Sequence, residues 1–96
     1  MTETRLREKA SKYEGMLSEA LESIEPGAGF DNDKAVEFRE MAESYLEDGR
    51  HFRGEGDEVN ALAAFSYGHA WLDAGMRMGF YDTDRYDLFT VDPDET

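Results

Sequence analysis

The strongest constraint on the fold is the stretch from Tyr45 to Gly79, which predicts two helices joined by a short glycine-containing turn. Gly54 and Gly56 can take the positive φ that ends a helix, and Asp57 can cap the helix that follows. Because only about four residues separate the two helices, they have to fold back antiparallel as a hairpin. The first helix of the pair has small and aromatic residues at alternating steps of three and four, the spacing of one helix face: Ala35, Phe38, Ala42, Tyr45, Gly49 and Phe52.

A second apolar seam predicts another helix, from Thr2 or Thr4 to about Glu25. Its residues fall at steps of 4, 3, 4, 3 and 4: Leu6, Ala10, Tyr13, Leu17, Ala20 and Ile24. The seam favours near-parallel or antiparallel packing on neighbouring helices. The segment from Pro26 to Asp33 is the first linker, and we expect Phe30 within it to cover the end of the bundle.

The helix predicted from about Glu58 to Gly79 is apolar around most of its circumference. One side carries large core residues and the adjacent side carries small ones: Leu62, Phe65, His69, Leu72 and Met76, then Ala61, Ala64, Gly68, Gly75 and Gly79. Beyond both lies a further apolar row, here called the outer ridge: Tyr67, Trp71 and Met78. A bundle helix needs an apolar arc of about 100 to 180°. Something besides two neighbouring helices therefore has to cover the outer ridge.

Two structures could cover the outer ridge. Residues 81–96 are too aromatic for a disordered tail and too short for a domain, so they could fold back as an extended strap. A second copy of the chain or another protein is the other candidate, because a contiguous exposed aromatic patch usually marks an interface. We therefore expect an all-α, up-and-down three-helix bundle over residues 1–80, with a C-terminal aromatic and acidic tail over residues 81–96.

The charge balance narrows the class of partner. Of the 96 residues, 23 are acidic and 10 are basic, which gives a net charge of −13. Such a field disfavours nucleic acid and anionic membranes. RNA binding through Arg50 and Arg53 is improbable for the same reason, since Glu47, Asp48 and Glu55 lie beside them. The acids are spread over every helix, an acid-rich and lysine-poor composition that resembles proteins of halophilic archaea.

Composition also bears on location. With no cysteine, disulfides and thiolate metal sites are excluded. The apolar runs are too short to span a membrane and the N-terminus lacks a secretory segment, so we expect a cytoplasmic protein.

No motif indicates a reaction, a cofactor or a metal. The run from Asp31 to Asp33 resembles the start of a calcium loop, but Val36 and Ala42 stand where that loop needs Gly and Glu. His69 and Asp73, one turn apart and near Tyr67, could serve acid–base chemistry in an inter-helix pocket. The seam position of His69 favours a hydrogen-bonded histidine at the core edge instead. The leading hypothesis is a protein-interaction or adaptor module, and the alternative is a small enzyme or ligand-binding protein with a pocket near His69.

The hairpin resembles a single tetratricopeptide repeat, W-x2-L-G-x2-Y followed by A-x3-F, except at Asp48. Any close-packed helical hairpin also needs small and aromatic residues in such places, and one repeat cannot bury its face alone. A second resemblance rests on the segments AESYLEDGRHF, GD and NALAAFSYGHAWLDAGMRMG. Over roughly residues 4 to 80 they are similar to the archaeal family called domain of unknown function 357. The resemblance implies an up-and-down three-helix bundle with no established activity and no catalytic residues to carry over.

Overall fold

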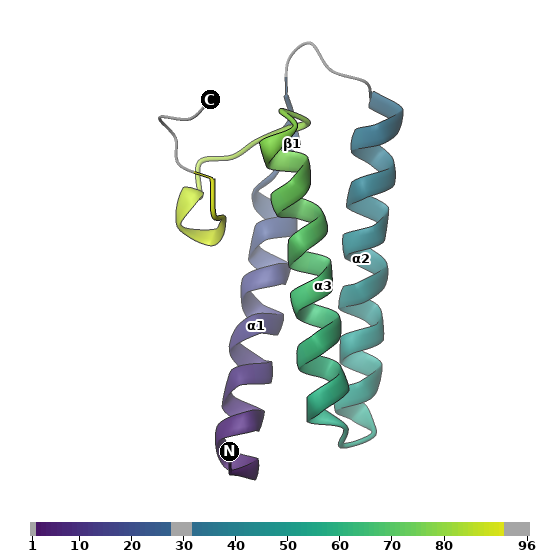
Figure 1. The fold of residues 1–96 in the computed structure, drawn as a ribbon, viewed down its shortest axis with the longest axis vertical. Coiled ribbons are helices and arrows are strands. Elements are labelled where there is room, and N and C mark those ends of the chain that lie inside the picture. The colour runs from purple at the N-terminus through teal and green to yellow at the C-terminus, as the bar shows by residue number, and fades with distance from the viewer. Residues whose placement is uncertain (1, 28–31, 92–96) are drawn as a thin grey trace.

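Three long helices run up, down and up along the molecule in the computed structural model, which describes residues 2–27 and 32–91 (Figure 1). Helix α1 spans Glu3–Ser23, α2 spans Asn32–Gly54 and α3 spans Glu58–Arg77. The predicted up-and-down three-helix bundle is confirmed.

Local sequence explains where the helices begin and turn. The Thr2 side chain caps α1 by accepting from the Arg5 amide at 3.2 Å, and the Asp57 side chain caps α3 by accepting from the Asn60 amide at 3.1 Å. Gly56, at φ 78°, supplies the left-handed residue that the turn between α2 and α3 needs. Phe30, expected to cover the bundle end, lies outside the described residues.

Helix α3 lies against both other helices and provides the centre of the core. Phe65 and Leu72 of α3 and Leu17 of α1 are the largest fully buried side chains. Gly68 allows the close approach, because a Cβ at this position would lie 2.8 Å from Leu17 Cδ2 and 3.0 Å from Tyr45 Cβ. One small residue thus sets the spacing of α3 to α1 and α2 together.

A two-stranded antiparallel ladder closes the upper end of the bundle. Strand β1, Glu25–Pro26, pairs with β2, Tyr81–Asp82, so that Glu25 faces Asp82 and Pro26 faces Tyr81. Gly79, at φ 76°, turns the chain out of α3 towards β2. The sequence did not predict these strands, since two residues are too few for a periodic pattern.

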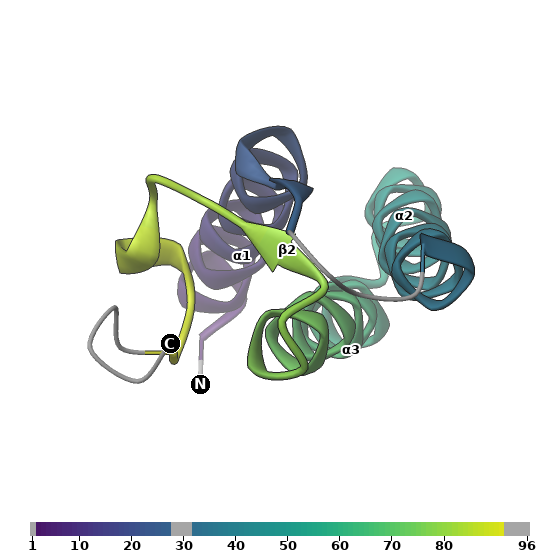
Figure 2. The same cartoon turned by 90° about the horizontal axis from the view of Figure 1, so that it is seen from above.

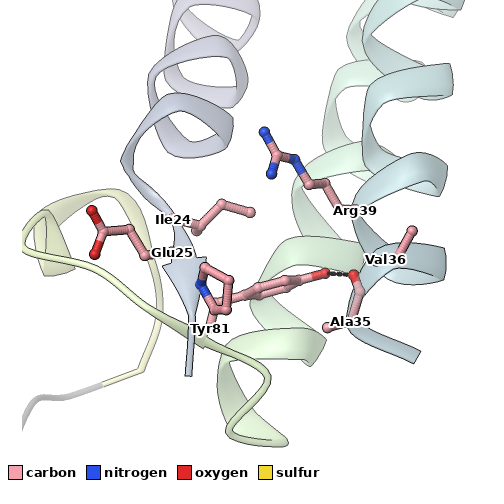
Figure 3. Close-up of a pocket in the computed structure, with 7 residues that line it drawn as sticks. Ile24, Glu25, Ala35, Val36, Arg39 and Tyr81 are labelled. Carbon is pink, nitrogen blue, oxygen red and sulfur yellow. Dashed lines mark hydrogen bonds between the residues drawn. The ribbon is translucent and has the colours of Figure 1, made fainter. Parts of the chain in front are cut away.

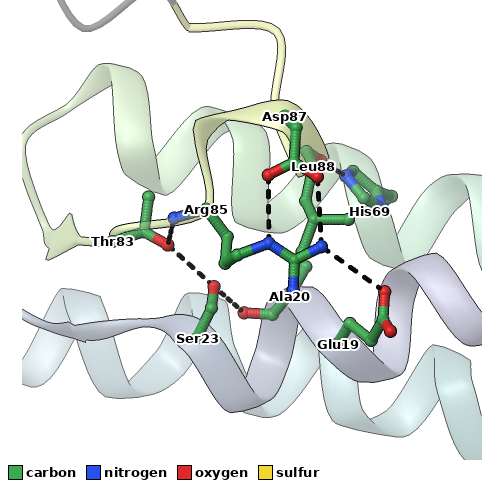
Figure 4. Close-up of polar contacts among 8 residues, drawn as sticks. All are labelled: Glu19, Ala20, Ser23, His69, Thr83, Arg85, Asp87 and Leu88. Carbon is green, nitrogen blue, oxygen red and sulfur yellow. Dashed lines mark hydrogen bonds and ion pairs between the residues drawn. The ribbon is translucent and has the colours of Figure 1, made fainter.

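After β2 the chain folds back beside α1 and α3 through a short 3₁₀ helix, η1, at Tyr86–Leu88 (Figures 1 and 2). Three apolar side chains of this returning segment, Leu88, Phe89 and Val91, are buried in the same cluster as the helix core. Thr83 Oγ1 donates to Ser23 Oγ at 2.8 Å and so fixes the start of the segment on α1 (Figure 4). We call residues 83–91 the tail segment.

A group of ion pairs joins the middle of α1 to the end of α2 and the start of α3. The Glu14 carboxylate of α1 accepts from Arg50 Nε at 3.0 Å and from Arg53 Nη1 at 2.9 Å, both in α2. Arg53 Nε also lies 3.3 Å from Glu58 Oε2 of α3. The two arginines considered for RNA binding are therefore engaged with carboxylates of neighbouring helices.

Acid should weaken the bundle through Glu14. Burial raises the pKa of Glu14, but the hydrogen bonds and charges of Arg50 and Arg53 outweigh burial and hold the pKa below its usual value. Because the folded pKa is the lower one, Glu14 stabilises the fold above its unfolded pKa of about 4.3, and this contribution is lost as pH falls through the folded pKa.

We expect Glu14→Gln to lower the free energy of unfolding by about 1 kcal/mol at neutral pH and to flatten its decline below about pH 4.3. Urea denaturation across that pH range measures both effects. Glu40→Gln, at an exposed position of α2, is the control. Identical pH dependence in the wild type and Glu14→Gln would contradict this assignment.

Candidate functional site

The outer ridge lies along the margin of α3 next to α2, where the rings of Tyr67 and Tyr45 lie 5.8 Å apart. Tyr67 and Met78 are 62% and 61% exposed. Trp71 is half-buried, because its ring meets the edge of Phe38 in α2 with centroids 5.0 Å apart. Helix α2 therefore covers part of the outer ridge at Trp71, whereas most of the surface of Tyr67 and Met78 is exposed to solvent.

Three exposed alanines extend this surface. Ala63, Ala70 and Ala74 fall at helical steps of three, four and seven from the ridge residues, so they share its face. Together with the outer ridge they form what we call the outward face of α3, which contains no charged side chain and runs for about 22 Å. A shallow hollow of about 280 Å³ lies on it, lined by Tyr67, Ala70, Trp71 and Ala74.

The tail segment does not cover the outward face. Seen from above, α1, α2 and the returning chain lie on the other sides of α3, and no described element faces its remaining side (Figure 2). The expectation that the tail would fold back as a strap agrees with the structure. The strap covers the groove between α1 and α3 rather than Tyr67 and Met78.

The tail segment is held by three side chains of α3, which we call the clasp: His69, Asp73 and Arg77. A ring nitrogen of His69 bonds to the Leu88 carbonyl (Figure 4). The Asp73 carboxylate accepts from the Thr90 amide at 2.9 Å and from Thr90 Oγ1 at 2.6 Å. Arg77 Nη2 donates to Thr90 Oγ1 at 3.1 Å and to the Thr90 carbonyl at 3.4 Å.

These contacts define what the region around His69 and Asp73 can do. A pocket of about 420 Å³ lies between α1 and α3, with Tyr13 and Met16 on its α1 side. The histidine and the carboxylate that line it bond to different residues of the tail rather than to each other. In this structure they act as backbone-binding groups. Sequence reasoning missed Thr90 and Leu88 as their partners, although the i, i+4, i+8 spacing of the clasp is visible.

A second pocket, of about 340 Å³, lies between the end of α1 and the start of α2 (Figure 3). Tyr81 crosses its floor and donates its hydroxyl to the Ala35 carbonyl, and burial raises the pKa of Tyr81. Arg39 at the margin bonds to Glu43 at 3.0 Å. No pattern in the sequence indicated this pocket, because Tyr81 is brought to it by the β1–β2 ladder.

The part of the chain that the structure describes contains neither a metal-binding cluster nor a membrane-spanning helix. Residues 2–27 and 32–91 bring together no group of three histidine or acidic side chains able to hold a metal ion. None of the helices in these ranges is long and apolar enough to cross a membrane.

The three helices define a small helical domain with an exposed apolar face on α3. The chain belongs to the family of proteins of unknown function DUF357, whose model matches residues 12–81. The resemblance seen in the sequence is thus confirmed. Because the match ends at residue 81, the tail segment lies beyond it.

A solved structure, protein AF1782 from Archaeoglobus fulgidus, is similar in fold and carries the same family description. The two chains superpose with a TM-score of 0.72 at 28% identity, over 86% of this chain and 99% of that one. No curated protein matches the sequence.

Proposed function

We propose that this protein is a protein-interaction module that docks a helix of a partner protein on the outward face of α3. The observation that carries the proposal is the exposure of Tyr67 and Met78 on a face without charge. Large apolar side chains gathered on one exposed face usually mark an interface, and aromatic residues and methionine are enriched there.

The shape of the outward face favours a helical partner. Its large residues alternate with Ala63, Ala70 and Ala74, whose small side chains let another helix approach closely. The hollow between Tyr67, Trp71 and Ala74 could receive one apolar side chain of that helix. This arrangement is the helix-in-groove mode, in which an amphipathic helix anchors at i, i+3, i+4 and i+7.

The net charge favours a different protein as the partner over a second copy of this chain. Two chains of net charge −13 repel each other, whereas a helix with lysine or arginine beside its apolar face is attracted. High salt would screen either effect, as expected for a chain with the composition of halophilic proteins. Self-association is the outcome to test first, by light scattering in molar KCl.

Site-specific photo-crosslinking tests the proposal. A photoreactive amino acid at Tyr67 or Met78 should capture one defined protein from the native cytosol. The same group at Val36 should not, although Val36 is 54% exposed, because it lies in α2 and not on the outward face of α3. Capture of the same proteins at all three positions would show non-specific adhesion and contradict the proposal.

The alternative function, a small enzyme or ligand-binding protein with a pocket near His69, has less support. The polar groups that such a pocket would use, on His69 and Asp73, are engaged by Leu88 and Thr90. A free acid–base pair would require the tail segment to leave.

A further inference from the structure

We infer that the groove between α1 and α3 is a binding site for an extended peptide segment of a partner protein, and that the chain's own tail occupies it here. The inference is independent of the outward face, because the groove lies on another side of α3.

The clasp binds the peptide backbone in an alternating pattern. His69, Asp73 and Arg77 stand one helical turn apart, and they contact in turn a carbonyl, an amide and a carbonyl of the tail segment. Leu88 is the last residue of η1 and Phe89 after it is extended, at φ −128° and ψ 163°, so the contact begins where the 3₁₀ helix gives way to extended chain. Helix–helix packing alone does not need this row of polar groups. Such a row can instead hold the backbone of a peptide segment that lies along the helix.

The side chains of the tail define the ligand. Leu88, Phe89 and Val91 are buried against the bundle, and the Phe89 ring lies 5.8 Å from the His69 ring. Thr90 remains exposed at the rim, where its hydroxyl contacts both Asp73 and Arg77. The site therefore fits two adjacent large apolar residues, then threonine or serine, then one apolar residue.

The groove and its present occupant belong to different parts of the chain. His69, Asp73 and Arg77 lie within the family match at residues 12–81, whereas the tail segment begins beyond it. The Arg85–Asp87 ion pair, at 3.0 Å, lies within the tail itself and would leave with it. A partner segment of the same pattern would make the same clasp contacts, in competition with a tethered tail whose effective concentration is of millimolar order.

The test uses a full-length variant in which the tail segment is released from the groove. Phe89→Asp places a charge in the buried part of the groove, which should release the tail. A fluorescent synthetic peptide of residues 85–91, RYDLFTV, is then titrated and followed by anisotropy. We expect binding to Phe89→Asp, binding at least about tenfold weaker to the wild type, and loss of binding when Asp73→Ala is added.

Three controls make the result specific. A peptide with the same Phe→Asp change should not bind. Tyr67→Glu in the Phe89→Asp chain should bind the peptide normally, which separates failure of this site from failure of the outward face. Circular dichroism establishes that each variant is folded. A folded Phe89→Asp chain that does not bind, or binding that survives Asp73→Ala, would overturn the inference.

A second measurement needs no tail variant. Millimolar unlabelled peptide should shift the Thr90 amide resonance of the wild-type chain towards its released position. If Phe89→Asp does not fold, the absence of this shift overturns the inference. A wild-type dimer that is lost in Phe89→Asp would also overturn it, because the groove would then take the tail of a second copy.

Discussion

Phe65→Ala is expected to lower the free energy of unfolding by about 3–5 kcal/mol. Phe65 is 0% exposed and is the largest fully buried side chain, so its removal takes away core contacts and leaves a cavity between α2 and α3. A domain of this size has a total stability of about 5–15 kcal/mol, so the loss is a large part of it. Urea denaturation followed by circular dichroism measures the change.

Tyr67→Ala is the matched control for Phe65→Ala. It removes an aromatic ring from the same helix, two residues away, but from a side chain that is 62% exposed. We expect its effect on the free energy of unfolding to stay below about 1 kcal/mol. Equal losses in the two variants would mean that the assignment of the inner and outer faces of α3 is wrong.

Gly49→Ala is expected to lower the free energy of unfolding by about 1–3 kcal/mol. A Cβ at Gly49 would lie 2.2 Å from Cε1 of the Phe65 ring, which is fully buried and has no free space to move into. Alanine is favoured over glycine within a helix by about 1 kcal/mol, so the clash has to outweigh this gain. Gly15→Ala, in α1 with nothing within 4 Å of the new Cβ, should show the gain alone.

The sign of the Gly49 effect should reverse when Phe65 is already alanine. With the ring gone, the three closest contacts of the added methyl group are removed, and Gly49→Ala should stabilise the chain by up to about 1 kcal/mol. A double-mutant cycle by urea denaturation measures this coupling. If Gly49→Ala destabilises both backgrounds equally, contact with the Phe65 ring is not the cause.

Periodicity predicted the helices because their stability depends on neighbours three and four residues apart. The turn at Gly56 and the cap at Asp57 are equally local, and both lie where the sequence placed them. The seam of α1 was predicted less completely. Leu21, which lies outside the predicted steps of three and four, is buried. Tyr13, which lies within the seam, is 36% exposed.

The tail and the Trp71 environment could not be predicted in the same way. The bonds from Thr90 to Asp73 join a backbone group to a side chain across 17 residues, and no repeat in the sequence specifies such a register. Trp71 falls on the outward side by helical angle, yet its large ring reaches sideways to Phe38 of α2. Helical angle predicts the direction of a Cβ and not the reach of an indole.

The most direct test of the account is the affinity of the partner captured at Tyr67 for three forms of the purified chain. Calorimetry should give a dissociation constant at least about tenfold weaker for Tyr67→Glu than for the wild type, as expected at an aromatic anchor. Val36→Glu, which introduces the same negative charge at an exposed position of α2, should stay within about twofold of the wild type. Equal weakening by both substitutions, or by neither, would contradict a docking role for the outward face of α3.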